Sequence, residues 1–181
     1  MGQGLSRKIR FWKLRKNRRV LLLGMDNAGK STVLYRLHAG KAVKTVPTIG
    51  HNVESVKFAG LEMVLWDVGG QEQLRGHWRH YYTGTQGIVF IVDSADGTRF
   101  QAVAEELQHV LADQQLDGVP VLVLANKQDM PGAASAEEIA KAADLEATCA
   151  GREWTVQAAE ANEGKGLEEG FQWLCQHMKR L

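Results

Sequence analysis

Hydrophobic positions along the chain follow two periods, one typical of strands and one typical of helices. Short, nearly continuous apolar runs bounded by turn residues predict buried strands. These runs span residues 20–23, 61–66, 86–92 and 120–125. Residues 52–58 and 154–157 add two further strand candidates. Because only Ala59 and Gly60 separate residues 52–58 from 61–66, we expect these two strands to form an antiparallel hairpin.

Between these runs, apolar residues recur at spacings of three and four, which predicts helices. One predicted helix follows Ser31, and two others cover residues 100–111 and 167–178. A short fourth helix is capped by residues 135–138. Alternating strands and helices favour an α/β fold. We expect a six-stranded, mostly parallel sheet with one antiparallel strand and helices on both faces. A ligand would then bind at the carboxyl ends of the strands.

The composition fits one domain with a basic arm. The chain has 181 residues, 44% of them hydrophobic, and a net charge of +1. Residues 1–19 hold eight Arg or Lys and no acid, so the remainder carries 14 basic against 21 acidic side chains. Cys149 and Cys175 have no metal or redox spacing, which favours reduced thiols in the cytoplasm. No apolar run reaches the ~18 residues that a membrane span needs.

The arm has the features of a membrane anchor. The chain begins with the pattern M-G-x-x-x-[ST], which predicts N-myristoylation of Gly2. Leu5, Ile9 and Trp12 form an apolar stripe among basic residues, as in helices that lie at a membrane interface. One acyl chain binds membranes only marginally, so the basic residues would supply a second attachment. A solvated terminus and a nucleic-acid-binding arm are the alternatives, and the combination of features favours the membrane.

A phosphate-binding loop stands between the first strand and the first helix. Residues 24–31 follow the pattern G-x-x-x-x-G-K-[ST] in its required position. Lys30 would neutralise the β- and γ-phosphates, and the Ser31 hydroxyl would bind Mg²⁺. Backbone N–H groups and the helix dipole would hold the phosphates. The predicted nucleotide contacts in this loop are Asp26, Asn27, Ala28, Gly29, Lys30, Ser31 and Thr32.

Two further motifs follow strands at the same edge of the predicted sheet. Asp67 ends an apolar strand and would hold Mg²⁺, while Gln71 would orient an attacking water. Asn126, Lys127 and Asp129 follow the strand at residues 120–125. The Asp129 carboxylate can accept hydrogen bonds from the N1–H and 2-amino groups of guanine, a pair that adenine lacks. The sequence therefore predicts that the nucleotide is GTP or GDP.

Together these motifs resemble small GTPases of the Arf/Arl (ADP-ribosylation factor and Arf-like) family. The resemblance covers essentially the whole chain. It implies a P-loop NTPase G domain at residues 18–181, preceded by the amphipathic arm at residues 1–17. The residues that carry it are 24–31, Pro47-Thr48-Ile49-Gly50, Trp66-Asp67-Val68-Gly69-Gly70-Gln71-Glu72 and 126–129, and Trp-Asp-x-Gly-Gly-Gln separates this family from Ras-like relatives.

The resemblance also implies roles for single residues and for partners. Thr48 would bind Mg²⁺ and the γ-phosphate, Gly70 would contact the γ-phosphate, and the Ala161 N–H would reach guanine O6. On GTP binding, the hairpin would slide in register and expel the arm to the membrane. The implied protein partners are an exchange factor, an activating protein that supplies an arginine, and effectors. The implied effector surface consists of Ile49, His51, Trp66 and Tyr81.

Three positions depart from the family pattern. His51 stands where Arf proteins usually have Phe, which removes an apolar anchor from the effector surface. Glu160-Ala161-Asn162 stands where the family has Cys-Ala-Thr or Ser-Ala-Lys/Leu, and Glu160 would tune nucleotide affinity. Asn27 and Ser31 replace Ala and Thr of many Arf proteins. A role of His51 as an ordinary solvated side chain and a role in effector selection both remain open.

We therefore expect a membrane-associated GTP/GDP switch that binds Mg²⁺ and hydrolyses GTP slowly. It would be a cytoplasmic monomer, reversibly bound to a trafficking membrane such as the Golgi, without a nucleic-acid partner. Arg75 and Arg79 follow Gln71 and are candidates for an arginine in cis. The alternatives are a metabolic P-loop kinase or ATPase, and a nucleic-acid-associated GTPase. The guanine motif disfavours the former, and the apolar stripe with Gly2 disfavours the latter.

Overall fold

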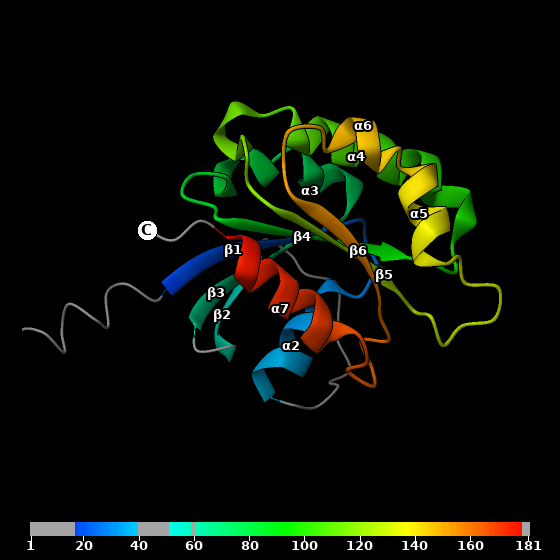
Figure 1. The fold of residues 1–181 in the computed structure, drawn as a ribbon, viewed down its shortest axis with the longest axis horizontal. Coiled ribbons are helices and arrows are strands. Elements are labelled where there is room, and N and C mark those ends of the chain that lie inside the picture. Colours follow the sequence, from blue (N-terminus) through cyan, green and yellow to red (C-terminus); the bar gives the residue numbers. More distant parts are fainter. Residues whose placement is uncertain (1–16, 40–50, 59–60, 179–181) are drawn as a thin grey trace, which may run out of the picture.

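The fold was described from a computed structural model of the chain, drawn in Figure 1. The structure describes residues 17–39, 51–58 and 61–178. Gly2 and almost all of the predicted arm lie outside the described residues, as do Thr48 and Ile49.

A six-stranded sheet in the order β2-β3-β1-β4-β5-β6 forms the centre of the molecule. Only β2 and β3 pair antiparallel, and every other pair of neighbours is parallel. The strands are β1 (Asn17–Leu23), β2 (His51–Phe58), β3 (Leu61–Val68), β4 (Gly87–Asp93), β5 (Val121–Asn126) and β6 (Trp154–Ala158). This arrangement confirms the predicted fold class, including the antiparallel hairpin.

Helices cover both faces of the sheet (Figure 1). The α-helices are α2 (Lys30–Ala39), α3 (Glu72–Arg75), α4 (Phe100–Leu111), α5 (Ala136–Ala142), α6 (Leu145–Thr148) and α7 (Leu167–His177). Short 3₁₀ helices are η1 (Trp78–Tyr81), η2 (Gly97–Arg99) and η3 (Gln114–Leu116). The predicted helices are present, whereas the hydrophobic pattern did not indicate α3, α6 or the 3₁₀ helices.

Alternation along β1 divides the core into two layers. Leu21 and Leu23 face one layer, which also contains residues of α4, α5 and α6. Val20 and Leu22 face the other layer, which contains residues of α2 and α7. All six residues of β5 are buried, as expected for a central strand covered on both faces. The two layers hold the sheet rigidly enough to fix the loops at its carboxyl edge.

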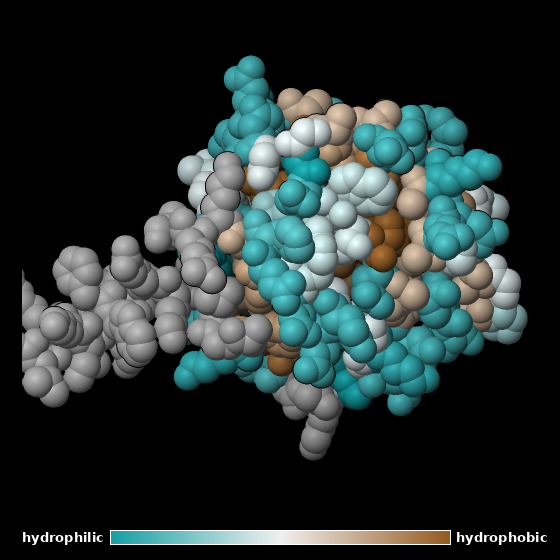
Figure 2. Space-filling view, in the orientation of Figure 1, coloured by the Kyte–Doolittle hydropathy of each residue, from teal (hydrophilic) through white to brown (hydrophobic). Residues whose placement is uncertain are grey.

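The face of the molecule drawn in Figure 2 carries many hydrophilic side chains. Figure 2 shows hydrophilic side chains over most of the visible face, interrupted by small hydrophobic patches. Among residues 18–38, 51–58 and 62–178, the large hydrophobic side chains that remain exposed are Val53 and Met130. Within the same ranges, no helix combines the length and apolar content needed to cross a bilayer.

Candidate nucleotide-binding site

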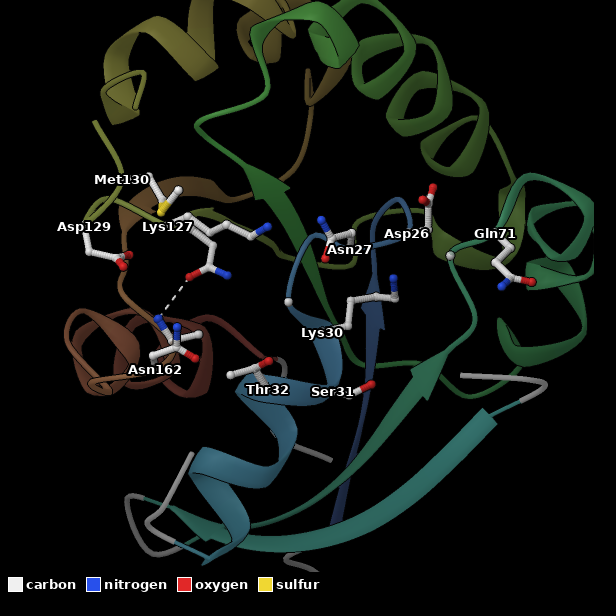
Figure 3. Close-up of a pocket in the computed structure, with 14 residues that line it drawn as sticks. Asp26, Asn27, Lys30, Ser31, Thr32, Gln71, Lys127, Asp129, Met130 and Asn162 are labelled. Atoms are coloured by element: carbon white, nitrogen blue, oxygen red, sulfur yellow. Dashed lines mark hydrogen bonds between the residues drawn. The ribbon is translucent and has the colours of Figure 1, made fainter. Parts of the chain in front are cut away.

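A cavity of about 410 Å³ opens at the carboxyl edge of the sheet (Figure 3). Parallel pairing brings the loops after β1, β3, β5 and β6 to this edge, and each loop contributes to the cavity wall. The lining residues are Asp26, Asn27, Gly29, Lys30, Ser31, Thr32, Gly70, Gln71, Asn126, Lys127, Asp129, Met130, Ala161 and Asn162. Four stretches that are distant in the sequence thus enclose one space.

The loop between β1 and α2 has the form of a phosphate cradle. Gly29 has a φ of +101°, and a Cβ at this position would collide with the side chain of Asn126. The Val33 N–H donates to the Gly29 carbonyl at 3.0 Å, which starts the hydrogen bonding of α2. The N–H groups of the first helical turn have no acceptor within the helix, so they can bind an anion at the cavity wall.

Lys30 is a cation held at the centre of this loop. It is 6% exposed, and its Nζ donates to the carbonyls of Gly24 at 2.9 Å and Met25 at 2.8 Å. Burial lowers the pKa of Lys30 to about 8, although Asp67 and Asp26 act in the opposite direction. A phosphate group would offer the ammonium a stronger partner than two carbonyls, because charge-assisted hydrogen bonds exceed neutral ones.

Ser31 and Asp67 form a pair of oxygen donors beside Lys30. The Ser31 hydroxyl donates to Asp67 Oδ2 at 2.5 Å, and Asp67 is fully buried at the end of β3. Proteins hold Mg²⁺ with one or two carboxylates together with substrate phosphates and waters. The chemistry of this pair therefore fits Mg²⁺.

The segment after β3 contacts the phosphate loop through its backbone. The Asp26 N–H donates to the Gly70 carbonyl at 3.0 Å, and a Cβ at position 70 would collide with Lys30 Nζ and the Gly24 carbonyl. The indole N–H of Trp78 donates to the Gly69 carbonyl at 2.8 Å and fixes the segment from the other side. Gln71 is exposed and lies on the cavity wall next to Asp26 in Figure 3.

Asn126 connects the two ends of the cavity. Its Nδ2 donates to the Ala28 carbonyl at 2.8 Å, and its Oδ1 accepts from the Ala161 N–H at 3.0 Å. Ala28 is itself buried behind the loop and does not line the cavity. The structure therefore places Asn126 as a link between the phosphate loop and the loop after β6.

Lys127 and Asp129 lie at the end of the cavity opposite Gln71 (Figure 3). Lys127 has a left-handed backbone with a φ of +67°, and its Nζ donates to Asp93 Oδ2 at 2.6 Å. Asp129 is exposed on the cavity wall beside Met130. The cavity therefore has a carboxylate at one end and the buried Lys30 away from it, which suits a ligand with a polar ring at one end and anions at the other.

Some residues of the site have no signal in the sequence. Arg99 of η2 donates to the Asp26 carboxylate at 2.7 Å and to the Asp26 carbonyl at 3.3 Å. Met130 and Asn162 line the cavity as neighbours of predicted residues. No spacing relative to the motifs marks Arg99, because it approaches the loop through the fold.

The two arginines that follow Gln71 are engaged elsewhere. Arg75 Nη1 lies 2.9 Å from Glu106 Oε2, and Arg79 Nε lies 2.7 Å from Asp113 Oδ2. In this conformation neither guanidinium is directed to the cavity. A cis arginine from this segment would first have to break an ion pair.

Three of the predicted effector residues meet on the surface. His51 Nδ1 lies 3.1 Å from the Tyr81 hydroxyl, and the His51 ring stacks on Trp66 with centroids 5.3 Å apart. The Arg19 guanidinium lies 4.0 Å above the Trp66 ring. The nearby Trp78 and Tyr82 are buried in the core. Ile49 is outside the described residues.

Two comparisons with known proteins agree with this geometry. Residues 5–178 match a family model described as the ADP-ribosylation factor family. Among solved structures, the fold is similar to that of the Arl6 BBS3 small GTPase from Trypanosoma brucei with bound nucleotide analogue GppNp. The two sequences are 32% identical, the match covers 88% of this chain and 96% of that chain, and the TM-score is 0.80.

Proposed function

The chain belongs to the ADP-ribosylation factor family of small GTPases, and from this premise we propose that it is a slow GTPase acting as a membrane-associated switch. In the GTP form it would bind effectors, and the process it serves would be vesicle or membrane trafficking. The G domain at residues 18–181 would bind GTP, GDP and Mg²⁺. The arm at residues 1–17 would bind the membrane through a myristoylated Gly2 and its basic residues.

One observation carries the nucleotide part of the proposal. Lys30, Ser31 and Asp129 line a single cavity although they come from separate stretches of the chain, and the Ser31 hydroxyl donates to the buried Asp67 carboxylate. This order of groups matches the order of phosphate, metal and base in a nucleotide. Asp129 would read the guanine edge, and the helix N-terminus at Lys30 would hold the phosphates.

Catalysis in this proposal depends on positioning and charge. Mg²⁺, when bound by Ser31, Asp67 and Thr48, would supply positive charge against the phosphate oxygens. Lys30 would hold the β- and γ-phosphates, and the Gly70 N–H would contact the γ-phosphate. Gln71 would orient the water that attacks the γ-phosphate. Because Arg75 and Arg79 are paired with acids, an arginine from an activating protein would complete the site and accelerate hydrolysis by about 10³–10⁵.

The hairpin β2–β3 would couple the nucleotide to the membrane arm. At one end of the hairpin His51 pairs with Val68, two residues before Gly70 of the cavity wall, and at the other end Phe58 pairs with Leu61. A change in register at one end would therefore be transmitted to the other. The arm would leave the domain and bind the cytoplasmic face of a trafficking membrane when GTP is present.

Partitioning onto anionic liposomes tests this switch. The acylated protein would be loaded with GDP or with a non-hydrolysable GTP analogue and compared with the Gly2→Ala variant. We expect the GTP-analogue form of the acylated protein to sediment with liposomes, and the GDP form and the variant to remain largely in solution. Equal partitioning of the two nucleotide forms would contradict the coupling and leave the nucleotide site unaffected.

A further inference from the structure

The loop after β6 is closed by an ion pair at its base. Glu160 Oε2 lies 2.7 Å from Lys165 Nζ, and the two residues also form an antiparallel bridge in which the Glu160 N–H donates to the Lys165 carbonyl at 3.0 Å. Residues directly opposite each other in such a bridge project to the same side. The Glu160 side chain is 21% exposed and the Lys165 side chain 68% exposed.

This ion pair stands next to the cavity wall without lining the cavity itself. Ala161 follows Glu160 directly and lines the cavity, and its N–H donates to Asn126 Oδ1. The hydrogen bond and charge of Glu160, with a smaller contribution from Glu163 and Asp129, raise the pKa of Lys165. The partner of the Lys165 ammonium is therefore the Glu160 carboxylate, 2.7 Å away.

The loop has other contacts that fix its shape. The Glu160 carbonyl accepts from the N–H groups of Glu163 at 3.1 Å and Gly164 at 2.8 Å. Arg36 Nη2 of α2 donates to the Glu163 carbonyl at 2.6 Å. Because these backbone bonds hold the loop without any contribution from the side chains of residues 160 and 165, the ion pair is not needed to place Ala161.

Without a cation beside it, the negative charge of Glu160 would disfavour the binding of guanine. Guanine presents a carbonyl oxygen, O6, at the position that the Ala161 N–H would reach, and an unpaired carboxylate one residue away would repel that oxygen. A purine with an amino group at position 6 would instead be attracted. A glutamate at this position therefore needs a nearby cation if the site is to prefer guanine.

We propose that Lys165 is a specificity-determining residue of the nucleotide site, which preserves the preference for guanine by pairing with Glu160 beside the base edge. This inference rests on the proposed guanine-nucleotide function and adds a residue to it. Lys165 acts through Glu160 and does not contact the base itself, so it is a positioning residue.

Dissociation constants for two nucleotides test the proposal. One is GDP, and the other is the diphosphate of 2,6-diaminopurine riboside, which keeps the 2-amino group and carries an amino group in place of O6. The proteins would be the full chain, Lys165→Met, Glu160→Gln and the double variant. Lys141→Met serves as the matched control, because Lys141 is an exposed lysine on α5.

We expect Lys165→Met to raise the dissociation constant of GDP about threefold, an effect of the size typical of losing an exposed charge pair. The dissociation constant of the diaminopurine nucleotide should not rise. Adding Glu160→Gln should restore GDP binding, because it removes the unpaired charge. The proposal would be overturned if Lys165→Met weakened the binding of both nucleotides equally, or if adding Glu160→Gln did not restore GDP binding. Either result would indicate a structural role for Lys165. Failure of the unmodified protein to prefer GDP to ADP would instead contradict the proposed function.

Discussion

The Ser31 hydroxyl and the Asp67 carboxylate lie 2.5 Å apart, although 36 positions separate them in the sequence. Parallel pairing of β1 with β3 brings them together, since Leu22 pairs with Asp67 and the loop after β1 leads directly to Ser31. This contact joins the phosphate loop to the segment that contains Gly70 and Gln71. It also gives the first prediction.

Removal of Mg²⁺ should accelerate release of bound GDP, and this acceleration should be smaller in Ser31→Ala. The reason is that the variant lacks one of the two oxygen donors to the ion. The measurement is the dissociation rate of a fluorescent GDP analogue with and without a chelator. Ser55→Ala, on the β2 strand, is the control and should respond like the unmodified protein. Identical responses of Ser31→Ala and Ser55→Ala would remove Ser31 from the metal site.

Gln71→Leu should slow single-turnover GTP hydrolysis by about tenfold or more and leave GTP affinity nearly unchanged. Leucine cannot hydrogen-bond to the attacking water, whereas binding depends on other parts of the cavity. Phosphate release from preloaded protein measures the rate. The exposed Gln73 of α3 does not line the cavity, so Gln73→Leu is the matched control. If Gln71→Leu and Gln73→Leu hydrolyse GTP equally fast, Gln71 has no catalytic role.

Trp78→Phe should lower the free energy of unfolding by about 2 kcal/mol. The indole is 1% exposed and donates to the Gly69 carbonyl, so the smaller ring leaves both a void and an unsatisfied carbonyl. Urea unfolding followed by circular dichroism measures the change. Trp173→Phe on α7 is the comparison, because Trp173 is only partly buried and stacks on His177. If Trp173→Phe lowered the free energy of unfolding as much as Trp78→Phe, the burial and hydrogen bond of Trp78 would not explain the effect.

Ser135→Ala should destabilise the protein by about 1 kcal/mol near neutral pH. The Ser135 hydroxyl accepts from the Glu138 N–H, and the Ser135 N–H donates to the Glu138 carboxylate. The bond from the Ser135 N–H, with a further contribution from the Ser135 side chain, lowers the pKa of Glu138 below its ordinary value of 4.5. A depressed carboxyl pKa stabilises the fold above the unfolded value and loses this effect as the pH falls through the folded value.

The difference in stability between the unmodified protein and Ser135→Ala should therefore be complete above pH 4.5 and shrink at lower pH. Unfolding at several pH values, with Ser135→Asn as a variant that keeps a capping oxygen, measures this. A difference that is independent of pH would show that the Ser135 side chain does not act on the Glu138 carboxyl.

Much of the fold follows from local sequence signals. β4 and β5 are recognisable because their residues are apolar on both faces, and the hairpin is recognisable because only two residues separate its strands. α5 is marked by its Ser135–Glu138 capping box, which the structure contains. The sequence pattern does not predict the four-residue helices α3 and α6 or the 3₁₀ helices, because they are too short to show a hydrophobic period.

The nucleotide site was recognisable where a motif lies within one loop. Lys30, Asp67 and Asp129 each stand in such a motif, and the fold brings these loops to one cavity. Contacts between distant segments are different, because they depend on packing. Neither the approach of Arg99 to Asp26 nor the pairing of Glu160 with Lys165 has a signature in the sequence. The burial of Trp78 likewise has no local signature, because it depends on how η1 packs in the fold.

Competition between GTP and ATP for the purified protein in the presence of Mg²⁺ tests the central claim most directly. Displacement of a fluorescent GDP analogue would be followed as each nucleotide is added. Two hydrogen bonds from the base to the Asp129 carboxylate should make GTP at least about a hundredfold stronger as a competitor than ATP. Equal displacement by ATP and GTP would contradict a guanine-nucleotide switch.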